Sequence, residues 1–251
     1  MVPYEAIFKR KTVRRFLPDP LSEKELLDLM KYEKNLVAQD RSILTKMEIL
    51  DVTKEKKKKK APYYLVIYSE KKEGWLSNAG CLIEQMVLYM ASKGIGTRYL
   101  GNVKYDKVLE GDLHYVIMVA FGKPAEEIYR PSFKAKRKPL SAISVTKEEM
   151  NPNFATMLEA ARLAPSALNR QPWFFEVFPR KIRMYYKRRS KIKHLSKMDE
   201  ISMGIMLAHL LTAADELWVD VVLRRPEQVP KGKMSYFLTL SLRKEEEGEK
   251  G

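Results

Sequence analysis

Two segments far apart in the chain carry side chains suited to binding a phosphorylated, planar ligand. In the first, at positions 8–16, Arg10, Thr12 and Arg14 alternate, so their side chains share one face of an extended backbone. Two guanidinium groups flanking a hydroxyl make a good phosphate receiver, because arginine offers planar, bidentate donors. The alternative interpretation is a solvated basic edge, since short basic runs are common in so basic a chain.

The second segment, at positions 161–175, has the residues of a tight polar turn that leads into a strand. Pro165 ends a helical pattern, Ser166 and Asn169 are turn formers, and Gln171 directly precedes a proline. Short donors and acceptors near backbone amides suit the carbonyl and imide edge of a planar heterocycle. The alternative is a helix-to-strand connection whose polar groups hydrogen-bond to their own backbone.

Two weaker segments complete the candidate site. Glycines in the stretch at 93–102 let the backbone come close to a flat ligand, and Tyr99 beside them is a candidate for lining the pocket. The stretch at 134–140 is basic, and Lys136 and Arg137 could complete a phosphate site. The glycine stretch is not a dinucleotide-binding fingerprint, and a solvated loop explains the basic stretch equally well.

The bulk composition is that of a globular protein, with 251 residues, 45% apolar and 31% charged. No apolar run is long enough to span a membrane and no signal peptide is recognisable, so we expect a cytoplasmic protein without a membrane partner. Cys81 is the single cysteine and the three histidines are scattered, which predicts neither a disulfide nor a metal site. The net charge of +15 attracts polyanions, but the basic residues are dispersed and no nucleic-acid-binding motif is evident.

The elements that must position these residues occur twice in the same order. Strands mixed with long helices predict an α+β fold. By apolar periodicity, caps and turn residues, we expect helices at 4–9, 22–36, 77–92, 152–163 and 201–217, and strands at 46–52, 63–69, 114–121, 173–178, 181–186, 219–225 and 236–242.

The repeated order predicts an internal duplication. Apolar positions align at two spacings, 127 for Leu27, Met30 and Leu36 against Phe154, Met157 and Leu163, and 124 for Gly80, Leu82 and Met86 against Gly204, Met206 and Leu210. Any two amphipathic helices can be aligned in this way, so the shared order is the stronger argument. We therefore predict two pseudo-two-fold-related halves with a ligand groove between them. Their ranges are 1–124 and 146–244, with a linker at 125–145 and a frayed tail at 245–251.

The sequence resembles the FMN-dependent nitroreductases, and within them a bacterial or archaeal branch that fuses both halves of the dimer in one chain. The resemblance rests most strongly on residues 164–173, APSALNRQPW, which match the family signature A-P-S-x-x-N-x-Q-P-W. The Arg-x-Ser/Thr-x-Arg/Lys opening at 10–14, the glycine pattern that ends at Leu100-Gly101, and Phe-Gly-Lys-Pro at 121–124 followed by Arg-Lys-Pro at 137–139 add to it.

In ordinary members of that family, each flavin takes the arginine opening from one subunit and the Pro-Ser loop from the other. Here the first half keeps the opening and the glycine motif, while the second half keeps the loop. The resemblance therefore implies a nitroreductase-like fold, one FMN per chain and one non-functional second site. It implies a monomer that mimics a dimer, and it leaves further oligomerisation open.

The resemblance also implies a role for each candidate residue. The FMN phosphate would be held by Arg10, Thr12 and Arg137, with Lys136 beside them, and Arg14 would reach the pyrimidine edge. The second half would contact the isoalloxazine edge, and the backbone after Tyr99 would face the flavin N5. The implied cofactor-binding residues are Arg10, Thr12, Arg14, Tyr99, Leu100, Gly101, Lys136, Arg137, Pro165, Ser166, Asn169 and Gln171.

The implied activity is that of an FMN-dependent oxidoreductase, with NAD(P)H as co-substrate and a nitroaromatic- or quinone-like small-molecule electron acceptor. The flavin carries the chemistry, so no catalytic side chain is assigned. Two alternatives are kept: a flavin-binding or sensing protein of the same fold without efficient turnover, and a basic nucleic-acid-binding protein, which would be colourless. Away from the site, we expect His209 to be a hydrogen-bonded interior histidine, and Trp75 and Trp218 to be packing residues.

Overall fold

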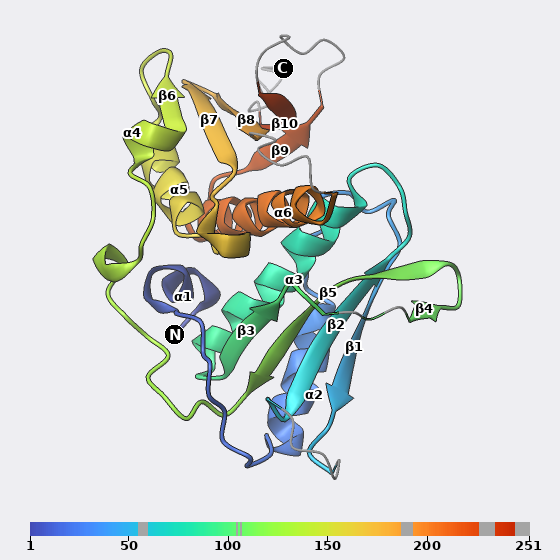
Figure 1. Cartoon of the computed structure of the whole chain (residues 1–251). Helices are drawn as coiled ribbons and strands as arrows, with labels where there is room; N and C mark the ends of the chain where they lie inside the picture. The colour runs from blue at the N-terminus through green and yellow to red at the C-terminus, as the bar shows by residue number, and fades with distance from the viewer. Residues whose placement is uncertain (55–59, 104, 106, 187–192, 226–233, 244–251) are drawn as a thin grey trace, which may run out of the picture.

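Two sheets lie on either side of a central pair of long helices, α3 and α6, in the computed structural model (Figure 1). The structure describes residues 1–54, 60–103, 105, 107–186, 193–225 and 234–243. The predicted α+β class is confirmed. Among the described residues, no helix combines the length and the apolar character that crossing a bilayer requires.

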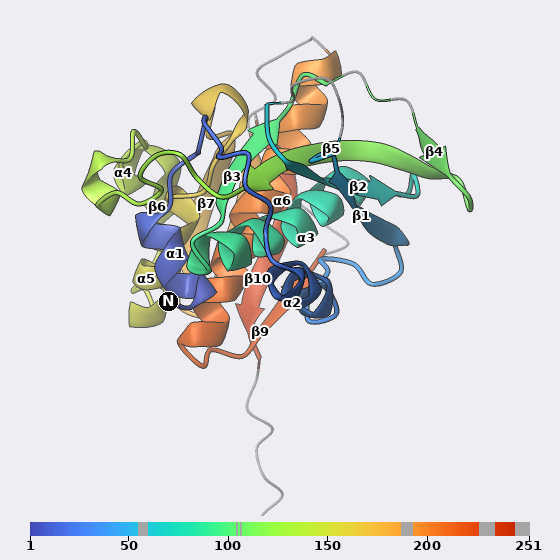
Figure 2. The ribbon, with the colours of Figure 1, turned by 90° about the horizontal axis from the view of Figure 1, so that it is seen from below.

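The first sheet has the strand order β1-β2-β5-β3, with every pair antiparallel and the short β4 beside β5. Helices α2 and α3 lie on the same face of this sheet (Figure 2). The elements of this half are α1 (Pro3–Lys9), α2 (Glu23–Glu33), β1 (Thr45–Asp51), β2 (Tyr63–Ser69), α3 (Trp75–Ser92), β3 (Gly96–Leu100), β4 (Val108–Leu109) and β5 (Leu113–Gly122).

The second sheet has the order β6-β7-β8-β10-β9, in which β6 runs parallel to β7 and the other pairs are antiparallel. Without β6, the order β7-β8-β10-β9 repeats the path of the first sheet. The remaining elements are η1 (Ser132–Lys134), α4 (Leu140–Ile143), β6 (Ser144–Thr146), α5 (Pro152–Arg162), η2 (Ala167–Asn169), β7 (Trp173–Phe178), β8 (Lys181–Tyr186), α6 (Lys193–Glu216), β9 (Val221–Arg224) and β10 (Ser235–Leu242).

Local sequence signals set many of these boundaries. The Ser22 hydroxyl accepts a hydrogen bond from the Glu25 N–H at 3.2 Å, and the Glu25 carboxylate accepts one from the Ser22 N–H at 2.7 Å, which is the predicted capping box of α2. Helix α3 ends at Lys93 and Gly94, and Gly94 has the left-handed φ of +78° that a helix C-terminus favours. Along β7, Trp173 and alternate residues after it are buried against the helices.

The crossing of α3 and α6 depends on two glycines that approach the opposite backbone. A Cβ at Gly80 would lie 2.3 Å from the Ile201 carbonyl oxygen, and one at Gly204 would lie 1.8 Å from that of Ser77. These contacts are reciprocal at the predicted spacing of 124, because Gly204 stands opposite Gly80 and Ile201 opposite Ser77. Such reciprocity is what a two-fold relation between the halves produces.

The predicted residue alignment of α2 with α5 is wrong. Leu27 and Met30 are 52% and 58% exposed, whereas their predicted counterparts Phe154 and Met157 are fully buried. The two helices start 129 positions apart (152 minus 23) rather than 127. The spacing of 127 therefore pairs the solvent-exposed face of α2 with the buried face of α5. An alignment of apolar residues does not show which of them are buried.

Other differences between the predicted and the observed elements concern the second half and the linker that leads to it. Helix α6 starts at Lys193, eight residues before the predicted start, and the prediction was late because the first two turns of the helix are mostly polar. The predicted linker at 125–145 contains α4 and most of β6, which joins the second sheet. The tail at 245–251 lies outside the described residues.

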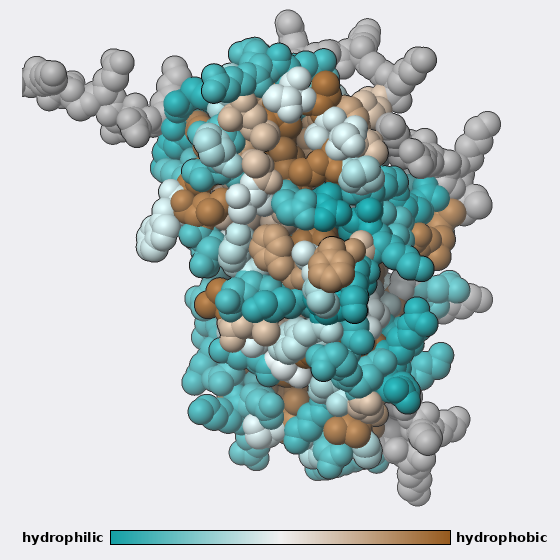
Figure 3. Space-filling model, turned by 90° about the vertical axis from the view of Figure 1, so that its left-hand side faces the viewer, coloured by the Kyte–Doolittle hydropathy of each residue, from teal (hydrophilic) through white to brown (hydrophobic). Residues whose placement is uncertain are grey.

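Exposed apolar side chains are dispersed over the surface. On the face that carries α1, small apolar areas are separated by hydrophilic residues (Figure 3). Trp218 is 95% exposed, so the prediction that it packs in the interior is wrong. It lies in the turn after α6, two residues beyond the last helical residue, whereas Trp75 packs against the core as predicted.

Candidate functional site

A cavity of about 560 Å³ lies between β3 and the first half of α6. It joins the two predicted segments, because Thr12 and Arg14 line it from one side of the sequence and Pro165 and Ser166 from the other. Its lining residues are Thr12, Arg14, Arg98, Tyr99, Gly101, Asn102, Ile117, Pro165, Ser166, Ala167, Leu168, His194, Leu195, Met198, Ile201, Ser202 and Ile205.

The Pro-Ser loop adopts an unusual backbone conformation at this cavity. Leu168, Asn169 and Gln171 have φ angles of +51°, +53° and +49°, a region that residues other than glycine seldom adopt. Such conformations persist only where the surroundings enforce them, and they concentrate at functional sites. Leu168 is 81% exposed at the tip of the loop, so the strain does not serve to bury it.

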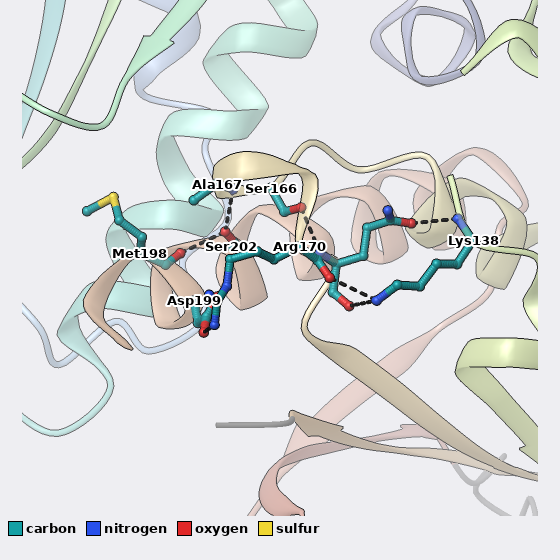
Figure 4. A network of polar contacts seen from close by, with 8 residues as sticks. Lys138, Ser166, Ala167, Arg170, Met198, Asp199 and Ser202 are labelled. Carbon is teal, nitrogen blue, oxygen red and sulfur yellow. Dashed lines mark hydrogen bonds and ion pairs between the residues drawn. The ribbon is translucent and has the colours of Figure 1, made fainter. Parts of the chain in front are cut away.

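Hydrogen bonds to α6 hold the loop in this shape (Figure 4). The Ser166 hydroxyl accepts from the Gln171 N–H at 2.9 Å, and the Ser202 hydroxyl accepts from the Ala167 N–H at 3.2 Å. The Ser202 O–H in turn donates to the Met198 carbonyl at 2.7 Å. The Ser166 O–H remains able to donate to a ligand, because the contact from Gln171 uses only a lone pair.

An ion pair and a lysine fasten the same loop on two further sides (Figure 4). The Arg170 guanidinium donates to both carboxylate oxygens of Asp199 on α6, at 2.9 and 2.8 Å, and Asp199 is 2% exposed. From the linker, the Lys138 ammonium donates to the carbonyls of Arg170 and Gln171 at 2.8 and 3.0 Å. The loop is therefore rigid before any ligand arrives, which favours binding.

A cluster of three arginines, Arg10, Arg130 and Arg137, lies beside the cavity. Burial and the charges of Arg130 and Arg10 lower the pKa of Arg137 to about 10. Burial and the charge of Arg10 likewise lower the pKa of Arg130. Arg10 is 8% exposed, and its Nε finds no hydrogen-bond partner among the described residues. Mutual repulsion and an orphaned buried N–H both indicate a site for an anion.

The structure brings half of the predicted residues to the cavity. Those that line it are Thr12, Arg14, Tyr99, Gly101, Pro165 and Ser166. The Leu100 side chain packs against a second hydrophobic cluster, whereas the prediction for this residue concerned its backbone. Arg10 and Arg137 belong to the neighbouring arginine cluster.

Asn169 and Gln171 act on the linker rather than on the cavity. The Asn169 side-chain oxygen Oδ1 accepts from Arg137 Nη1 at 2.9 Å, and the side-chain Nδ2 donates to the Lys136 backbone carbonyl at 2.8 Å. The Gln171 side-chain oxygen accepts from the Lys138 N–H at 2.7 Å. In the structure, Asn169 contacts Arg137 directly and Gln171 contacts the next residue of the linker, while Lys136 contributes its carbonyl and keeps its side chain exposed.

Sequence reasoning missed several lining residues on α6 and the partners of Tyr99. Met198, Ile201 and Ile205 recur at helical spacing on one face, but the start of this helix was placed too late to include the first of them. Arg98 lies in the glycine stretch at 93–102 but was not singled out there, and Arg130 stands in no motif that the sequence presents. Their proximity to the site comes from strand pairing and from the path of the linker, which a single sequence does not reveal.

A buried polar chain lies behind Tyr99. The Tyr99 hydroxyl donates to Glu84 Oε2 at 2.6 Å, and Glu84 Oε1 lies 2.8 Å from His209 Nε2. Both Glu84 and His209 are fully buried, and His209 Nδ1 lies 2.9 Å from the Ala160 carbonyl, which confirms the prediction of an interior hydrogen-bonded histidine. Burial and the Glu84 carboxylate raise the pKa of Tyr99.

The residues fit a phosphorylated planar heterocycle such as FMN. The cavity volume falls in the range of about 300–1,000 Å³ that small-ligand sites occupy. Ile117, Ile201 and Ile205 offer apolar surface for a ring system, and the arginine cluster with its free Arg10 Nε offers a place for a phosphate.

Comparisons with known proteins identify a family model and solved structures that this chain resembles. The family model described as "Putative TM nitroreductase" matches residues 3–214. A putative nitroreductase from Thermotoga maritima shares the fold, with a TM-score of 0.69 and 24% identity over 96% of this chain and 94% of that one. No curated protein matches the chain.

Shorter solved structures match about half of the chain. An FMN-dependent nitroreductase from Clostridium difficile has a TM-score of 0.42 and 12% identity over 51% of this chain and 93% of that one. A putative NADH dehydrogenase/NAD(P)H nitroreductase from Bacteroides thetaiotaomicron has a TM-score of 0.42 and 15% identity over 53% and 94%. Because the family model spans most of the sequence, this chain belongs to the putative TM nitroreductase family, whose general role is that of an oxidoreductase.

Proposed function

We propose that the protein is an FMN-dependent NAD(P)H oxidoreductase that carries one complete flavin site per chain. The acceptor is an electron-poor small molecule, such as a nitroaromatic or a quinone. The observation that carries the proposal is the meeting of Thr12 and Arg14 with Pro165 and Ser166 around one cavity. More than a hundred residues separate these segments, and each alone had an ordinary structural explanation.

The arginine cluster is the phosphate end of the proposed site. Arg10 and Arg137 would donate to the phosphate oxygens, which would give the Arg10 Nε a partner and offset the burial and the repulsion that lower the pKa of Arg137. Thr12 would add a hydroxyl donor. Asn169 supports this end through its bond to Arg137.

The other lining residues would hold and tune the ring. Arg14 places a positive charge where negative charge develops on the pyrimidine edge, which favours the reduced state. The Ser166 O–H is free to donate to a ring carbonyl from the opposite side. Bound FMN supplies the hydride-transfer chemistry, so the chain needs no acid or nucleophile of its own. Arg98 and Arg14 also attract the anionic nicotinamide nucleotide.

Colour and stoichiometry test the cofactor assignment. The purified protein should be yellow, release FMN on denaturation, and bind about one FMN per monomer. It should bind riboflavin more weakly, since riboflavin lacks the phosphate. A colourless protein that FMN does not titrate, and that instead binds nucleic acid with a steep salt dependence, would contradict the proposal.

Turnover is tested separately. Anaerobic NADH or NADPH should bleach the bound flavin, and a quinone or nitroaromatic should restore its absorption over many cycles. Flavin that binds but is not reduced would support a flavin-binding or sensing role instead.

A further inference from the structure

Arg98 on β3 is a cation in the cavity lining to which the proposed flavin contacts assign no role. Its side chain is partly buried, and the guanidinium makes no hydrogen bond or ion pair with the described residues. Taking a charge out of water without a partner costs free energy. Arg98 therefore indicates an anion that comes from outside the chain.

Strand pairing explains why no acidic side chain neutralises Arg98. Arg98 pairs with Ala120 on β5, Ala120 with Tyr64 on β2, and Tyr64 with Leu50 on β1. Residues that stand directly opposite one another share one face of a sheet. The row of side chains that crosses the first sheet from Arg98 therefore contains no carboxylate.

The carboxylate in the neighbouring row is already engaged. That row lies on the same face and runs from Leu100 on β3 to Glu48 on β1. Glu48 accepts from the Lys107 ammonium at 3.0 Å and from the Tyr68 hydroxyl at 3.1 Å. Because β1 and β3 are opposite edges of the sheet, Glu48 does not provide a partner for Arg98.

Backbone contacts bring Arg98 and Arg14 to the same side of the cavity. The Val13 N–H donates to the Thr97 carbonyl at 3.0 Å, and a Cβ at Gly96 would lie 2.9 Å from Val13 Cγ2. The opening segment therefore runs along the free edge of β3. Arg14 and Arg98 directly follow the two bonded residues, and both line the cavity.

The other side of the cavity is apolar. Leu195 and Met198 line it from α6, and Leu168 lines it from the exposed tip of the Pro-Ser loop. A Cβ at Gly101 would lie 3.4 Å from Met198 Sδ, so this apolar side approaches β3 three residues after Arg98. A ligand held between the two sides meets apolar side chains on one and guanidinium groups on the other.

The second half has no cation that corresponds to Arg98. At the spacing of 124 that relates the two halves, Val222 on β9 stands opposite Arg98. Val222 is not among the described residues that line the second cavity. An edge strand at this place in the fold therefore does not require an arginine, and the cation occurs in the half where the proposed flavin cavity lies.

We propose that the electron acceptor is a planar, apolar molecule that carries an anionic group such as a carboxylate, and that Arg98 selects it over its uncharged analogue. The inference rests on the proposed function and names the class of its acceptor. The Arg98 guanidinium offers paired donors to a carboxylate, while Leu195 and Met198 contact the ring. Arg98 acts on binding and orientation and adds no chemical step.

The phosphates of NAD(P)H are a second possible source of negative charge. In the dinucleotide a ribose separates them from the nicotinamide, whereas the carboxylate of an aromatic acid is attached directly to its ring. Arg98 lines the same cavity as Ser166 and Ile201, which the proposed function places at the flavin ring. We therefore assign to Arg98 the group attached to the ring, and the experiment separates the two sources.

Nitrobenzoate and nitrobenzamide test the proposal, because they share their shape and nitro group and differ in charge. The perturbation of flavin absorption in the FMN-loaded protein, without NAD(P)H, gives the dissociation constant of each. The wild type should bind nitrobenzoate about tenfold more tightly, which is the scale of one charge-assisted hydrogen bond. Turnover with NAD(P)H then gives kcat/KM for each compound.

Arg98→Gln should bring the two dissociation constants together and lower the ratio of kcat/KM, nitrobenzoate over nitrobenzamide, about tenfold. A ratio cancels effects that act on both compounds, such as a changed flavin potential or a loosened fold. Arg98→Lys should keep part of the preference, because it retains the charge but not the paired donors. Arg224→Gln is the matched control: it removes an exposed arginine from β9, so the net charge changes equally. It should keep the wild-type preference.

Three results would overturn the proposal while leaving the proposed function intact: equal binding of both compounds by the wild type, a preference that persists in Arg98→Gln, or an equal loss in Arg224→Gln. Anaerobic reduction of the bound flavin by NAD(P)H, without acceptor, tests the other source. A variant impaired only in that reduction would assign Arg98 to the nucleotide and refute the inference. If Arg98→Gln does not fold, Arg98→Met, which keeps an apolar stem, replaces it. Failure of FMN to bind at all would instead refute the proposed function.

Discussion

Two cavities at corresponding places in the two halves differ mainly in charge. The proposed flavin cavity lies at the start of α6 beside β3, and a second cavity of about 410 Å³ lies at the start of α3 beside β10 and the end of β9. The described lining of the first contains Arg14 and Arg98 and no carboxylate. The second is lined by Glu73, Gly74, Ser77, Tyr186, Glu200, Met203, Arg225, Ser235, Tyr236 and Phe237, and its Arg225 is paired with Glu73. Among the described residues, an anion therefore meets cations without a lining carboxylate in the first cavity and a cation paired with a carboxylate in the second.

The loops that hydrogen-bond to the two long helices, α6 and α3, also share an attachment but differ in sequence. In the second half, the Ala167 N–H donates to the Ser202 side chain at 3.2 Å, and in the first half the Asp40 N–H donates to the Asn78 side chain at 3.0 Å. The attachment of the loop to the long helix is thus kept in both halves. The Pro-Ser sequence is present only in the second, so a loop attached to the long helix in this way does not by itself present the Pro-Ser chemistry.

The largest expected effect comes from removing Arg10, whose Nε has no hydrogen-bond partner among the described residues. Arg10→Gln should weaken FMN binding about 10- to 100-fold, since hydrogen bonds to charged groups contribute about 1.5–3 kcal/mol. Fluorescence quenching of FMN on titration measures this directly. Arg225→Gln, at the second cavity, should leave FMN affinity within about twofold. Equal losses in both variants would mean that the two cavities are not distinguished by charge.

Breaking the ion pair that anchors the Pro-Ser loop should lower stability by about 1–3 kcal/mol, because Arg170 would lose its charged partner, which is 2% exposed, and one of its two acceptor oxygens. Asp199→Asn is the variant, and thermal unfolding with and without FMN is the measurement. FMN should bind several-fold more weakly to the loosened loop. Glu73→Gln removes the pair of the second cavity, where the Glu73 side chain is 89% exposed, and should leave the unfolding temperature nearly unchanged.

Ser166→Ala should cost about 1 kcal/mol in FMN binding, which is roughly fivefold in the dissociation constant. The variant removes one donor to the ligand and the acceptor of the Gln171 N–H. Ser77→Ala is the matched change at the second cavity, where the hydroxyl donates to the Gly74 carbonyl at 3.0 Å. If Ser77→Ala weakened FMN binding as much as Ser166→Ala, the assignment of the flavin to the first cavity would fail.

Local patterns predicted much of this molecule, and long-range contacts account for the rest. The bounds of β2, β7 and β8 follow from apolar strand patterns and match the structure. Ser166 was placed at the cavity from its motif, and the structure agrees. Asn169 stands in the same motif, yet its side chain is turned to Arg137, a residue 32 positions away.

The partners that the sequence did not reveal lie still further apart. Glu84 and His209 are separated by 125 positions and meet only because α3 and α6 cross at two glycines. Residue types at single positions indicate a turn, a cap or a cation, but they do not indicate which distant segment will face them.

The smallest effect should come from the residues that end the two long helices. Gly94 follows α3 with φ +78°, and Trp218, 124 positions later, follows α6 with φ +55°. A left-handed backbone is unstrained for glycine and costs other residues about 1 kcal/mol. Trp218→Gly should therefore be neutral or raise stability slightly, because the exposed indole makes little contact that the variant could lose.

Gly94→Ala should lower stability by about 1 kcal/mol through backbone strain alone, since no atom lies within 4 Å of the added Cβ. Urea unfolding of the two variants would resolve this difference, and destabilisation by Trp218→Gly would show that the tryptophan makes a contact the monomer does not contain.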